Sequence, residues 1–452
     1  MTVASQTVAD SGYRVVVGLG ATGLSCARFL WRHGIRFVIV DTRAHPPGLD
    51  ELRSEMPGVT VYAGEYPQDI IAAAEEVIVS PGVAMDAGVV VEAVAAGVDI
   101  VGDIDLFVRE ATAPVIGITG SNAKSTVTEL LGQMARDANM NAGVGGNLGT
   151  PALELLAPER ELYVLELSSF QLERAHDLNL QVATVLSADH LDRHGTMRRY
   201  RMAKHRIFNG CKNAVVNRDD PLTQPLLNAD VTVVSWGMGE PEAGNFGLCW
   251  RSGTEYLCFG NDALVPVAEL NLVGRHNVAN ALAAMALGHC AGLPLASMAA
   301  SLRVFRGLPH RCERVADIDG VRYINDSKGT NVGATEAALR GLGGERNVLL
   351  IAGGQGKGAD FTPLRESVAR HCKLLLVIGE DGPLLAQALS QSVPVLMMST
   401  LQDAVNTAAA RAEQGDIVLL SPACASFDMF SGYVDRGNTF VAQVRDLAEG
   451  RQ

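Results

Sequence analysis

The chain has 452 residues, of which 48% are hydrophobic and 19% charged, and this predicts a globular protein of about three domains. Its formal net charge of −13 argues against nucleic acid as a partner, because that binding needs a basic face. No apolar run approaches the roughly 18 residues of a membrane span, and Met1–Asp10 lacks the pattern of a signal peptide. We therefore expect a cytoplasmic protein without membrane insertion, and we expect it to be a monomer.

The eight cysteines show no paired metal spacing such as C-x-x-C. They stand at positions 26, 211, 249, 258, 290, 312, 372 and 424. Because a cytoplasmic protein sits in a reducing compartment, we expect all of them to be thiols, buried or partly buried.

Residues 13 to 102 alternate short apolar runs with helical patterns. The pattern predicts strands at Tyr13–Val17, Arg36–Val40 and Glu76–Val79, and a helix at Leu24–His33. Between the first strand and the helix lies a G-x-G-x-x-G turn, Gly18 to Gly23. Asp41 ends the second strand, at about the distance where an acidic residue binds a ribose in dinucleotide folds. This context favours a nucleotide or nucleotide-sugar pocket over an ordinary tight turn, with Ser80-Pro81-Gly82 completing its rim.

A second α/β segment opens with a strand at Pro114–Ile118, a turn of small residues, and a helix at Thr126–Ala138. Strand, tight loop, Lys124-Ser125-Thr126 and helix form the layout that wraps backbone N–H groups around a phosphate, with the lysine neutralising charge and a hydroxyl reaching Mg²⁺. The match is imperfect, because Ile118 and Ala123 occupy the two glycine positions of the pattern, and an ordinary strand-to-helix turn is the alternative. Further strands are expected at Leu162–Leu167, Val182–Leu186, Ala214–Val216 and Val231–Val234.

Three polar residues in this segment are candidates for a functional role. Glu166 lies inside an apolar strand, and a buried carboxylate is costly unless it is paired or binds metal. We favour an Mg²⁺ ligand over a strand-end charge in solvent. His190 lies between two aspartates after the next strand, without the fuller ligand set that zinc needs. Lys204 falls in a basic helical stretch, for which the residue pattern alone predicts a solvated face.

The third segment begins near Arg311. Before it, Asn277 and Asn280 share one face of an alanine-rich helix, where they either brace the helix or contact a purine edge. Strands are expected at Asn347–Ala352, Leu374–Ile378, Val393–Met398 and Ile417–Leu420. Asp326 and Lys328 follow a short apolar run, and having both an acid and a base there favours a nucleotide-contacting loop over an ordinary turn.

Taken in order, these motifs resemble the Mur ligases, the ATP-dependent amide-forming enzymes of peptidoglycan precursor synthesis. The motifs are T-G-S-N-x-K-S-T, E-L-S-S-F-Q, D-H-x-D-R, the lysine helix, G-x-H-N-x-x-N, L-P-H-R and N-D-S-K-x-T-N. They cover nearly the whole chain. The fold expected is α/β with three domains: an N-terminal Rossmann-like sheet (1–102), a central P-loop ATPase-like mononucleotide-binding domain (103–307) and a C-terminal Rossmann-like domain (308–452).

Within the family, three stretches are most similar to the member that joins D-glutamate to UDP-N-acetylmuramoyl-L-alanine: residues 18–25, 165–173 and 420–428. The resemblance thus implies that ATP drives this amide bond through an acyl phosphate, with two Mg²⁺ ions. It also implies that Lys204 carries a CO₂-derived carbamate, which turns a cation into a metal-bridging carboxylate and reverses the expectation of a solvated face.

The resemblance assigns a role to each of the motif residues. For catalysis it implies Lys124, Glu166, His190, Lys204 and Lys328. For metal it implies Ser125, Glu166, His190 and carbamylated Lys204. For ATP it implies Gly120, Ser121, Asn122, Ala123, Lys124, Ser125, Thr126, Asn277, Asn280, Arg311 and Asp326. For the UDP-sugar it implies Gly20, Ala21, Thr22, Asp41, Thr42, Arg43, Ser80, Pro81, Gly82, Asn147, Ser168 and His190. For the amino acid it implies Thr330, Lys357, Ser426 and Tyr433.

Two positions depart from the family pattern. Ala123 replaces the usual glycine before the loop lysine, and alanine there costs roughly 1 kcal/mol only if the position needs a positive φ. Tyr433 stands where phenylalanine is expected, which keeps the packing and adds a hydroxyl.

Three alternatives remain from the sequence. A nicotinamide-dependent oxidoreductase would use Gly18–Gly23 and Asp41 but leave the phosphate loop unexplained. A nucleotide-sugar binding protein without catalysis would leave Lys204 idle. A sibling ligase, such as a folylpolyglutamate synthase, is disfavoured by the glycine-rich N-terminal pocket.

Overall fold

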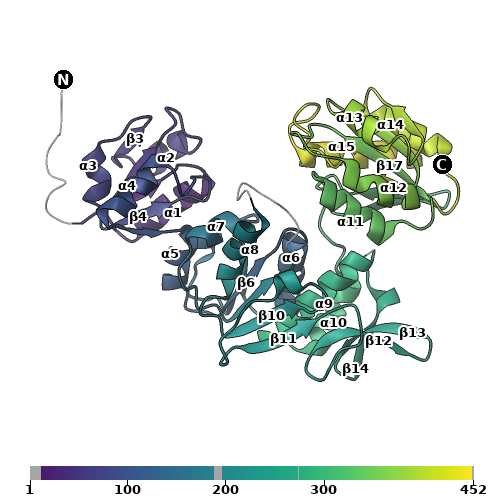
Figure 1. Cartoon of the computed structure of the whole chain (residues 1–452). Coiled ribbons are helices and arrows are strands. Elements are labelled where there is room, and N and C mark those ends of the chain that lie inside the picture. The colour runs from purple at the N-terminus through teal and green to yellow at the C-terminus, as the bar shows by residue number, and fades with distance from the viewer. Residues whose placement is uncertain (1–11, 188–195, 273, 450–452) are drawn as a thin grey trace. The chain divides into compact units, whose positions relative to one another are not determined.

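The computed structural model describes residues 12–187, 196–272 and 274–449 (Figure 1). The chain divides into two compact units, and each is described by itself. The first consists of Met1–Gly247, Phe259–Asn261 and Ala283–Met298, and the second of Leu248–Cys258, Asp262–Leu282 and Ala299–Gln452. Within the described residues, none of the helices has the length and apolarity that a membrane crossing requires.

The first unit opens with a parallel sheet of five strands in the order β3-β2-β1-β4-β5. Its strands are β1 (Arg14–Val17), β2 (Phe37–Asp41), β3 (Val61–Ala63), β4 (Glu76–Val79) and β5 (Asp99–Val101), with helices α1 (Ala21–Arg32), α2 (Leu49–Glu55), α3 (Gln68–Ala72) and α4 (Gly88–Ala96). Because β2 and β4 flank β1 on opposite sides, the loop after β1 lies at a topological switch point, where ligands bind in such sheets.

Helix α5 (Asp103–Glu110) leads into a sheet of nine strands in the order β14-β13-β12-β11-β10-β9-β6-β8-β7. Its strands are β6 (Val115–Thr119), β7 (Ala142–Gly146), β8 (Leu162–Glu166), β9 (Val182–Val185), β10 (Asn213–Asn217), β11 (Thr232–Trp236), β12 (Phe246–Arg251), β13 (Thr254–Phe259) and β14 (Asp262–Pro266). The helices of this segment are α6 (Lys124–Asp137), α7 (Ser169–Arg174), α8 (Met197–His205), α9 (Arg275–Cys290) and α10 (Leu295–Val304). Strand β6 lies between β8 and β9, so the loop after β6 is at a second switch point.

One hydrophobic core joins the first sheet to the start of the second. The cluster includes Val16 and Ile39 from the five-stranded sheet, Phe107 from α5, and Leu165 and Ala183 from β8 and β9, all buried. The ring of Phe107 meets that of Tyr163 edge to face, with centroids 5.0 Å apart. Side chains on both sides of residue 102 therefore complete a single apolar core.

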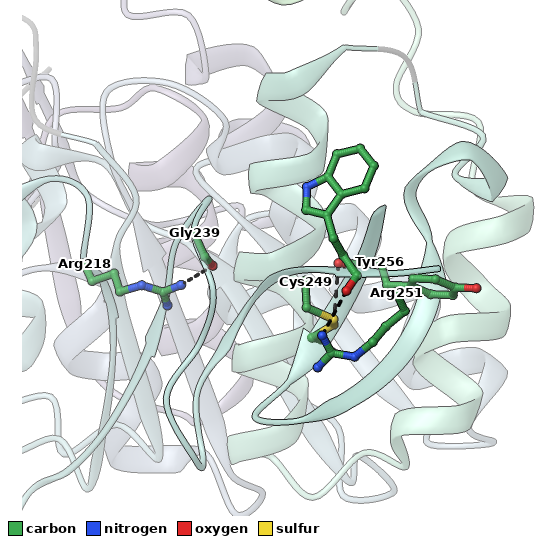
Figure 2. The surroundings of a disulfide bond; sticks show 7 residues. Arg218, Gly239, Cys249, Arg251 and Tyr256 are labelled. Carbon is green, nitrogen blue, oxygen red and sulfur yellow. Dashed lines mark hydrogen bonds between the residues drawn. A yellow bond between two sulfur atoms is a disulfide. The ribbon is translucent and has the colours of Figure 1, made fainter. Parts of the chain in front are cut away.

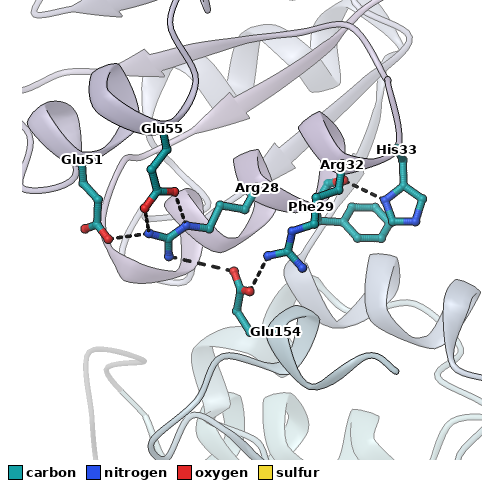
Figure 3. Close-up of polar contacts among 7 residues, drawn as sticks. All are labelled: Arg28, Phe29, Arg32, His33, Glu51, Glu55 and Glu154. Atoms are coloured by element: carbon teal, nitrogen blue, oxygen red, sulfur yellow. Dashed lines mark hydrogen bonds and ion pairs between the residues drawn. The ribbon is translucent and has the colours of Figure 1, made fainter. Parts of the chain in front are cut away.

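Ion pairs reinforce this joint at its surface (Figure 3). Arg32 on α1 pairs with Glu154, which belongs to a short 3₁₀ helix of the central segment. Arg28, one turn earlier on α1, pairs with Glu51 and Glu55 of α2. These side chains are all partly exposed, so water screens the ion pairs and each adds little to stability.

The second unit holds a six-stranded sheet in the order β15-β16-β20-β17-β18-β19. Its strands are β15 (Glu313–Ile318), β16 (Val321–Asn325), β17 (Val348–Gly353), β18 (Cys372–Ile378), β19 (Val395–Met397) and β20 (Ile417–Leu420), with helices α11 (Val332–Leu342), α12 (Arg365–His371), α13 (Gly382–Leu389), α14 (Leu401–Arg411) and α15 (Tyr433–Glu449). Only the β15–β16 pair is antiparallel among the strand pairs recorded for this sheet. The loops after β16, β20 and β17 leave from the same edge of three neighbouring strands.

The expectation that every cysteine is a thiol is wrong for two of them. Cys249 on β12 and Cys258 on β13 form a disulfide (Figure 2), with Cα atoms 6.1 Å apart. The pairing escapes spacing rules because it results from two neighbouring strands of the sheet, not from a short sequence motif. The other six cysteines are free thiols.

Candidate functional site

The phosphate loop follows β6 and bends sharply before α6. Gly120 has φ of 152°, and a Cβ there would lie 3.1 Å from the Cβ of Leu186. Ser121 N donates to Ser187 O at 2.9 Å, and Asn122 N donates to Ser187 Oγ at 3.1 Å. Hydrogen bonds to the end of β9 therefore fix the loop that the sequence motif predicts.

Ala123 occupies the left-handed region, with φ of 67° and ψ of −16°, directly before the first residue of α6. The cost of alanine here depends on this angle, and the observed positive φ meets the condition. For a residue with a Cβ, this conformation costs on the order of 1 kcal/mol relative to glycine.

Two lysines converge on one carbonyl of the loop. Lys124 Nζ and Lys204 Nζ each donate to Gly120 O at 2.8 Å, and Lys124 also reaches Ser121 O at 3.3 Å. Lys204 is only 2% exposed, and its Nζ lies 4.5 Å from the ring centroid of Tyr200. The solvated face predicted from the basic pattern of α8 is therefore wrong for Lys204, because the helix turns this one residue into the loop.

Glu166 ends β8 in register with Ile118, two residues before Gly120. Its carboxylate is buried, and Oε1 accepts a hydrogen bond of 2.7 Å from Asn147 Nδ2. Oε2 is buried and has no hydrogen-bond partner among the residues that the structure describes. An unpaired buried carboxylate oxygen beside the hydroxyl-bearing helix start at Ser125 fits a hard cation such as Mg²⁺.

The rest of the expected metal set is not all described. His190, with its neighbours 188–195, lies outside the described residues. Elsewhere in the described chain there is no group of three His, Cys, Asp or Glu side chains that could hold a metal by themselves.

Several of the residues expected to bind the UDP-sugar lie on or near the loop after β1. A Cβ on Gly23 would lie 1.8 Å from Gly18 O, so only glycine fits at the start of α1. Asp41 Oδ2 accepts from Leu19 N at 2.8 Å, and the Arg43 guanidinium donates to both oxygens of Asp41 at 2.9 and 2.6 Å. Burial raises the pKa of Asp41, but the hydrogen bonds from Arg43 and Leu19 outweigh it and leave that pKa below its ordinary value.

Of the other residues expected to bind the UDP-sugar, Ser80 contacts the same loop, whereas Ser168 lies at the start of α7 and Asn147 bonds Glu166 at the end of β8. Ser80 Oγ donates to Gly18 O at 2.8 Å, which holds the turn of Ser80, Pro81 and Gly82 against it. Ala21 and Thr22 begin α1 after Gly20, and Thr42 lies between Asp41 and Arg43. Ser168 caps α7, with its Oγ accepting from Gln171 N at 3.2 Å.

In the second unit, a cavity of about 250 Å³ gathers residues predicted for ATP. Asn277 and Arg311 line it, together with Asn271, Arg306 and Arg314. Asn280 Nδ2 donates to Asn277 Oδ1 at 3.0 Å, so Asn280 orients the carboxamide that borders the cavity. Burial raises the pKa of Asp326 to about 6, and its carboxylate accepts from Ser421 Oγ at 2.7 Å and from Cys312 N at 3.2 Å.

The predicted amino-acid residues lie on the three loops at one edge of the six-stranded sheet. Lys328 follows β16, and its Nζ stands 4.0 Å from the ring centroid of Tyr433. Lys357 follows β17, Ser426 follows β20, and Ser426 is buried. Thr330 lies two residues beyond Lys328, with its N–H bonded to Lys328 O at 2.8 Å. The tyrosine that departs from the family pattern thus contacts a lysine through its ring.

Sequence reasoning missed the group that fastens these loops. Arg436 on α15 is 1% exposed and donates to carbonyls on all three loops: Ser327 O at 2.9 Å, Cys424 O at 3.1 Å and Gly353 O at 3.4 Å. Burial lowers its pKa to about 10. No sequence signal points to it, because an arginine near the start of an amphipathic helix is ordinarily solvated.

Tyr200 was also missed, although a signal existed. Its hydroxyl lies 2.9 Å from Ser121 Oγ, and it is one helical turn before Lys204. Residues four apart share a helix face, so assigning Lys204 to the site places Tyr200 there as well.

Comparisons with known proteins agree along the whole chain. Residues 13–102 match the family described as "Mur ligase MurD-like, N-terminal domain", residues 118–288 match "Mur ligase middle domain", and residues 310–424 match "Mur ligase, glutamate ligase domain".

Two full-length relatives have the same name. The UDP-N-acetylmuramoylalanine–D-glutamate ligase of Pseudomonas aeruginosa is 52% identical over 445 residues, which cover 98% of this chain and 99% of the relative. That of Hahella chejuensis is 51% identical over 436 residues, covering 96% and 98%.

Solved structures share the fold at low identity. A pseudomurein peptide ligase type C from Methanothermus fervidus superposes with a TM-score of 0.61 at 17% identity, over 96% of this chain and all of the other. A UDP-N-acetylmuramate–alanine ligase from Thermotoga maritima has a TM-score of 0.56 at 19% identity, over 96% of this chain and 99% of the other.

Proposed function

This chain belongs to the Mur ligase family, and from that premise we propose that it joins D-glutamate to UDP-N-acetylmuramoyl-L-alanine in peptidoglycan precursor synthesis, with cleavage of ATP to ADP and phosphate. Its full-length relatives support this choice of substrates. The structural observation that carries the ligase chemistry is the meeting of Lys124 and Lys204 on the phosphate loop, next to the strand that Glu166 ends.

The first step activates a carboxylate, which does not react with an amine at neutral pH. An oxygen of the L-alanine carboxylate attacks the γ-phosphorus of ATP, the bond to the β-phosphate oxygen breaks, and an acyl phosphate and ADP result. Lys124 and the N–H groups of the loop and of the first turn of α6 stabilise the negative charge of the moving phosphoryl group.

Ser125 and Glu166, with His190, are proposed to hold Mg²⁺. When bound, Mg²⁺ neutralises phosphate charge and polarises the γ-phosphate. The buried Oε2 of Glu166 supports this role, because ionised and unpaired it would be costly. Asn147 orients the Glu166 carboxylate through Oε1.

Lys204 is proposed to carry a carbamate. Two ammonium groups that share one carbonyl acceptor in a buried place repel each other. Carbamylation replaces the Lys204 cation with a carboxylate and so removes this repulsion.

In the second step the amine of D-glutamate attacks the acyl carbon. The glutamate ammonium first loses a proton, a tetrahedral oxyanion forms, and inorganic phosphate leaves as the amide bond is completed. Thr330, Lys357, Ser426 and Tyr433 are proposed to hold the amino acid, with Lys328 near the transferred phosphate. Asn277, Asn280, Arg311 and Asp326 are proposed to serve ATP.

The uridine diphosphate is proposed to occupy the loop after β1. Asp41, Thr42 and Arg43 would contact the uracil and the diphosphate, and the start of α1 at Ala21 and Thr22 offers N–H groups to a phosphate. Ser80, Pro81 and Gly82 close the rim, and Asn147 and Ser168 lie toward the muramoyl end.

The test is phosphate release from ATP and Mg²⁺ with UDP-N-acetylmuramoyl-L-alanine, comparing D-glutamate, L-glutamate and meso-diaminopimelate. We expect release with D-glutamate alone and a product heavier by one glutamyl residue. Release with another amino acid would keep the ligase mechanism and overturn the substrate. No release with any of them, from folded protein, would overturn the proposed reaction.

A further inference from the structure

We propose that Arg174 is a positioning residue that holds the UDP pocket of the first sheet in register with the phosphate loop of the central sheet. The inference rests on the proposed function, since it concerns a substrate whose UDP end and reacting carboxylate occupy these two places. Arg174 lies in neither set of residues that the motifs assign.

Arg174 ends α7 with its side chain buried, at 3% exposure. Its two terminal nitrogens donate to carbonyls on both sides of the joint. One bonds Phe170 O in its own helix, and the other bonds Val83 O, at the end of the turn that carries Ser80, Pro81 and Gly82. The guanidinium of Arg174 thus connects helix α7 of the central segment to the turn after β4 in the first sheet.

On the pocket side, the contact continues to the glycine loop. Val83 N donates to Ser80 O at 3.0 Å, and Ser80 Oγ donates to Gly18 O at 2.8 Å. A Cβ on Gly18 would lie 3.0 Å from Val83 Cγ2, so this turn packs directly on the loop after β1. Moving Val83 therefore moves the wall of the UDP pocket.

On the catalytic side, α7 starts three residues after the end of β8. Ser168 caps the helix through Gln171, and Gln171 Nε2 donates to Asp103 Oδ2 at 2.8 Å. Asp103 begins α5, the helix that leaves the first sheet. Hydrogen bonds thus tie α7, the helix that follows the strand ended by Glu166, to both the pocket rim and the connecting helix.

The guanidinium geometry suits this task better than another cation would. A planar fork donates in two fixed directions, whereas a lysine offers one compact charge. The aliphatic stem also packs on the backbone, because a Cβ on Gly102 would lie 3.5 Å from Arg174 Cγ. Nearby Asp103 interacts with the guanidinium electrostatically.

This geometry predicts that a change at Arg174 affects the affinity for UDP and the affinity for UDP-N-acetylmuramoyl-L-alanine differently. UDP alone contacts only the first sheet, where Ser80 still fastens the rim to Gly18 when Arg174 is changed. UDP-N-acetylmuramoyl-L-alanine spans both sheets, so it needs the register that Arg174 sets. Loss of one charge-assisted hydrogen bond between the two parts weakens the long ligand by about tenfold.

The experiment compares Arg174→Met with the unchanged full chain by calorimetric titration with UDP and with UDP-N-acetylmuramoyl-L-alanine. Methionine keeps the stem and removes both donors. We expect the affinity for UDP to stay within twofold and the affinity for the long substrate to fall about tenfold. The KM for ATP, measured from phosphate release, should also stay within twofold. Arg174→Lys, which retains the charge, should recover part of that loss.

Arg32→Met is the matched control, because Arg32 also links the first sheet to the central segment but at the exposed ion pair with Glu154 (Figure 3). An equal loss in this control, an equal loss of UDP affinity, or no loss at all would overturn the role of Arg174. The proposed function fails separately, when the unchanged chain binds the long substrate but releases no phosphate with D-glutamate. An unchanged chain that does not bind the long substrate overturns both.

Discussion

At the scale of single residues, the site combines strain and burial that the sequence motif hides. Ala123 holds a left-handed conformation where glycine would be relaxed, and Lys204 is buried against the ring of Tyr200 and the loop carbonyl of Gly120. Both features are local, and each can be tested by one substitution.

Ala123→Gly should stabilise the chain. Glycine removes the left-handed strain of about 1 to 2 kcal/mol, and its freer unfolded chain offsets about 0.4 to 1 kcal/mol of that gain. Urea unfolding should show a net increase of about 0.5 to 1 kcal/mol. Ala135→Gly, in the interior of the same helix, is the control and should destabilise by about 1 kcal/mol or more. A lower stability for Ala123→Gly would contradict the strain.

Lys204→Ala should reduce D-glutamate-dependent phosphate release by at least about a hundredfold. The proposed carbamate would be a ligand for Mg²⁺ at the phosphate loop, and the charge stabilisation that such a metal provides is worth several kcal/mol in a buried site. Adding a short carboxylate such as acetate or propionate should restore part of the rate. Full activity of Lys204→Ala without an added carboxylate would rule out the carbamate.

Glu166→Gln should abolish ATP turnover while leaving the fold intact. The amide can still accept the hydrogen bond from Asn147, but it provides a poor ligand for Mg²⁺. The measurement is phosphate release across a range of Mg²⁺ concentrations, with circular dichroism as the control for folding. A rate near that of the unchanged chain would show that Glu166 is not a ligand of Mg²⁺.

At the scale of elements, buried strands were predictable and exposed ones were not. The apolar runs that predict β1, β4 and β20 lie within a residue of the observed strands. The strands β12 to β14 were missed: β13 and β14 begin with polar residues, and β12 ends in two exposed residues after four buried ones. Buried parallel strands read as continuous apolar runs, whereas half-exposed edge strands leave a weak signal.

The residues of the candidate site also fall into those that the sequence predicts and those that it does not. Loops that follow apolar strands were found from the sequence, since parallel strands bring their carboxyl ends to one edge. The structure confirms that Asp41 ends β2 and that Glu166 ends β8, buried. Arg174 and Arg436 could not be found, because their importance comes from carbonyls that only the folded chain brings near.

Arg436→Met tests how strongly one side chain fastens the three loops after β16, β17 and β20. Removing the guanidinium leaves several buried carbonyls without their donor, at a cost of about 1 to 3 kcal/mol each. We expect the free energy of unfolding to fall by at least 3 kcal/mol. Arg445→Met, later on the same helix, is the control and should change stability by less than 0.5 kcal/mol. A small change in the free energy of unfolding of Arg436→Met would show that the three loops keep their structure without the guanidinium.

At the scale of the whole molecule, buried carboxyls make stability depend on pH. Burial raises the pKa of Asp103 to about 6 from an ordinary value of 3.8. Between these two values the native chain holds a proton that the unfolded chain has lost. The free energy of unfolding therefore falls as pH rises through this window, and the loss persists above pH 6.

Asp103→Asn removes the pH dependence that Asp103 causes. The stability that this variant gains over the unchanged protein should therefore be larger at pH 8 than at pH 4.5. A shift of about two pKa units corresponds to at most about 3 kcal/mol of this difference. Urea unfolding at both pH values gives the measurement, with Asp50→Asn, exposed on α2, as the control. A pH-independent difference would mean that Asp103 stays ionised in the native state.

The apolar core that spans residue 102 has a consequence for synthesis on the ribosome. When the first sheet has been translated, the side chains of β8, β9 and β10 that belong to the same core do not yet exist. At about 5 to 20 residues per second, more than a hundred further residues take on the order of ten seconds to emerge. For that time the nascent chain exposes half of a core, and a chaperone that shields apolar surface would find its substrate there.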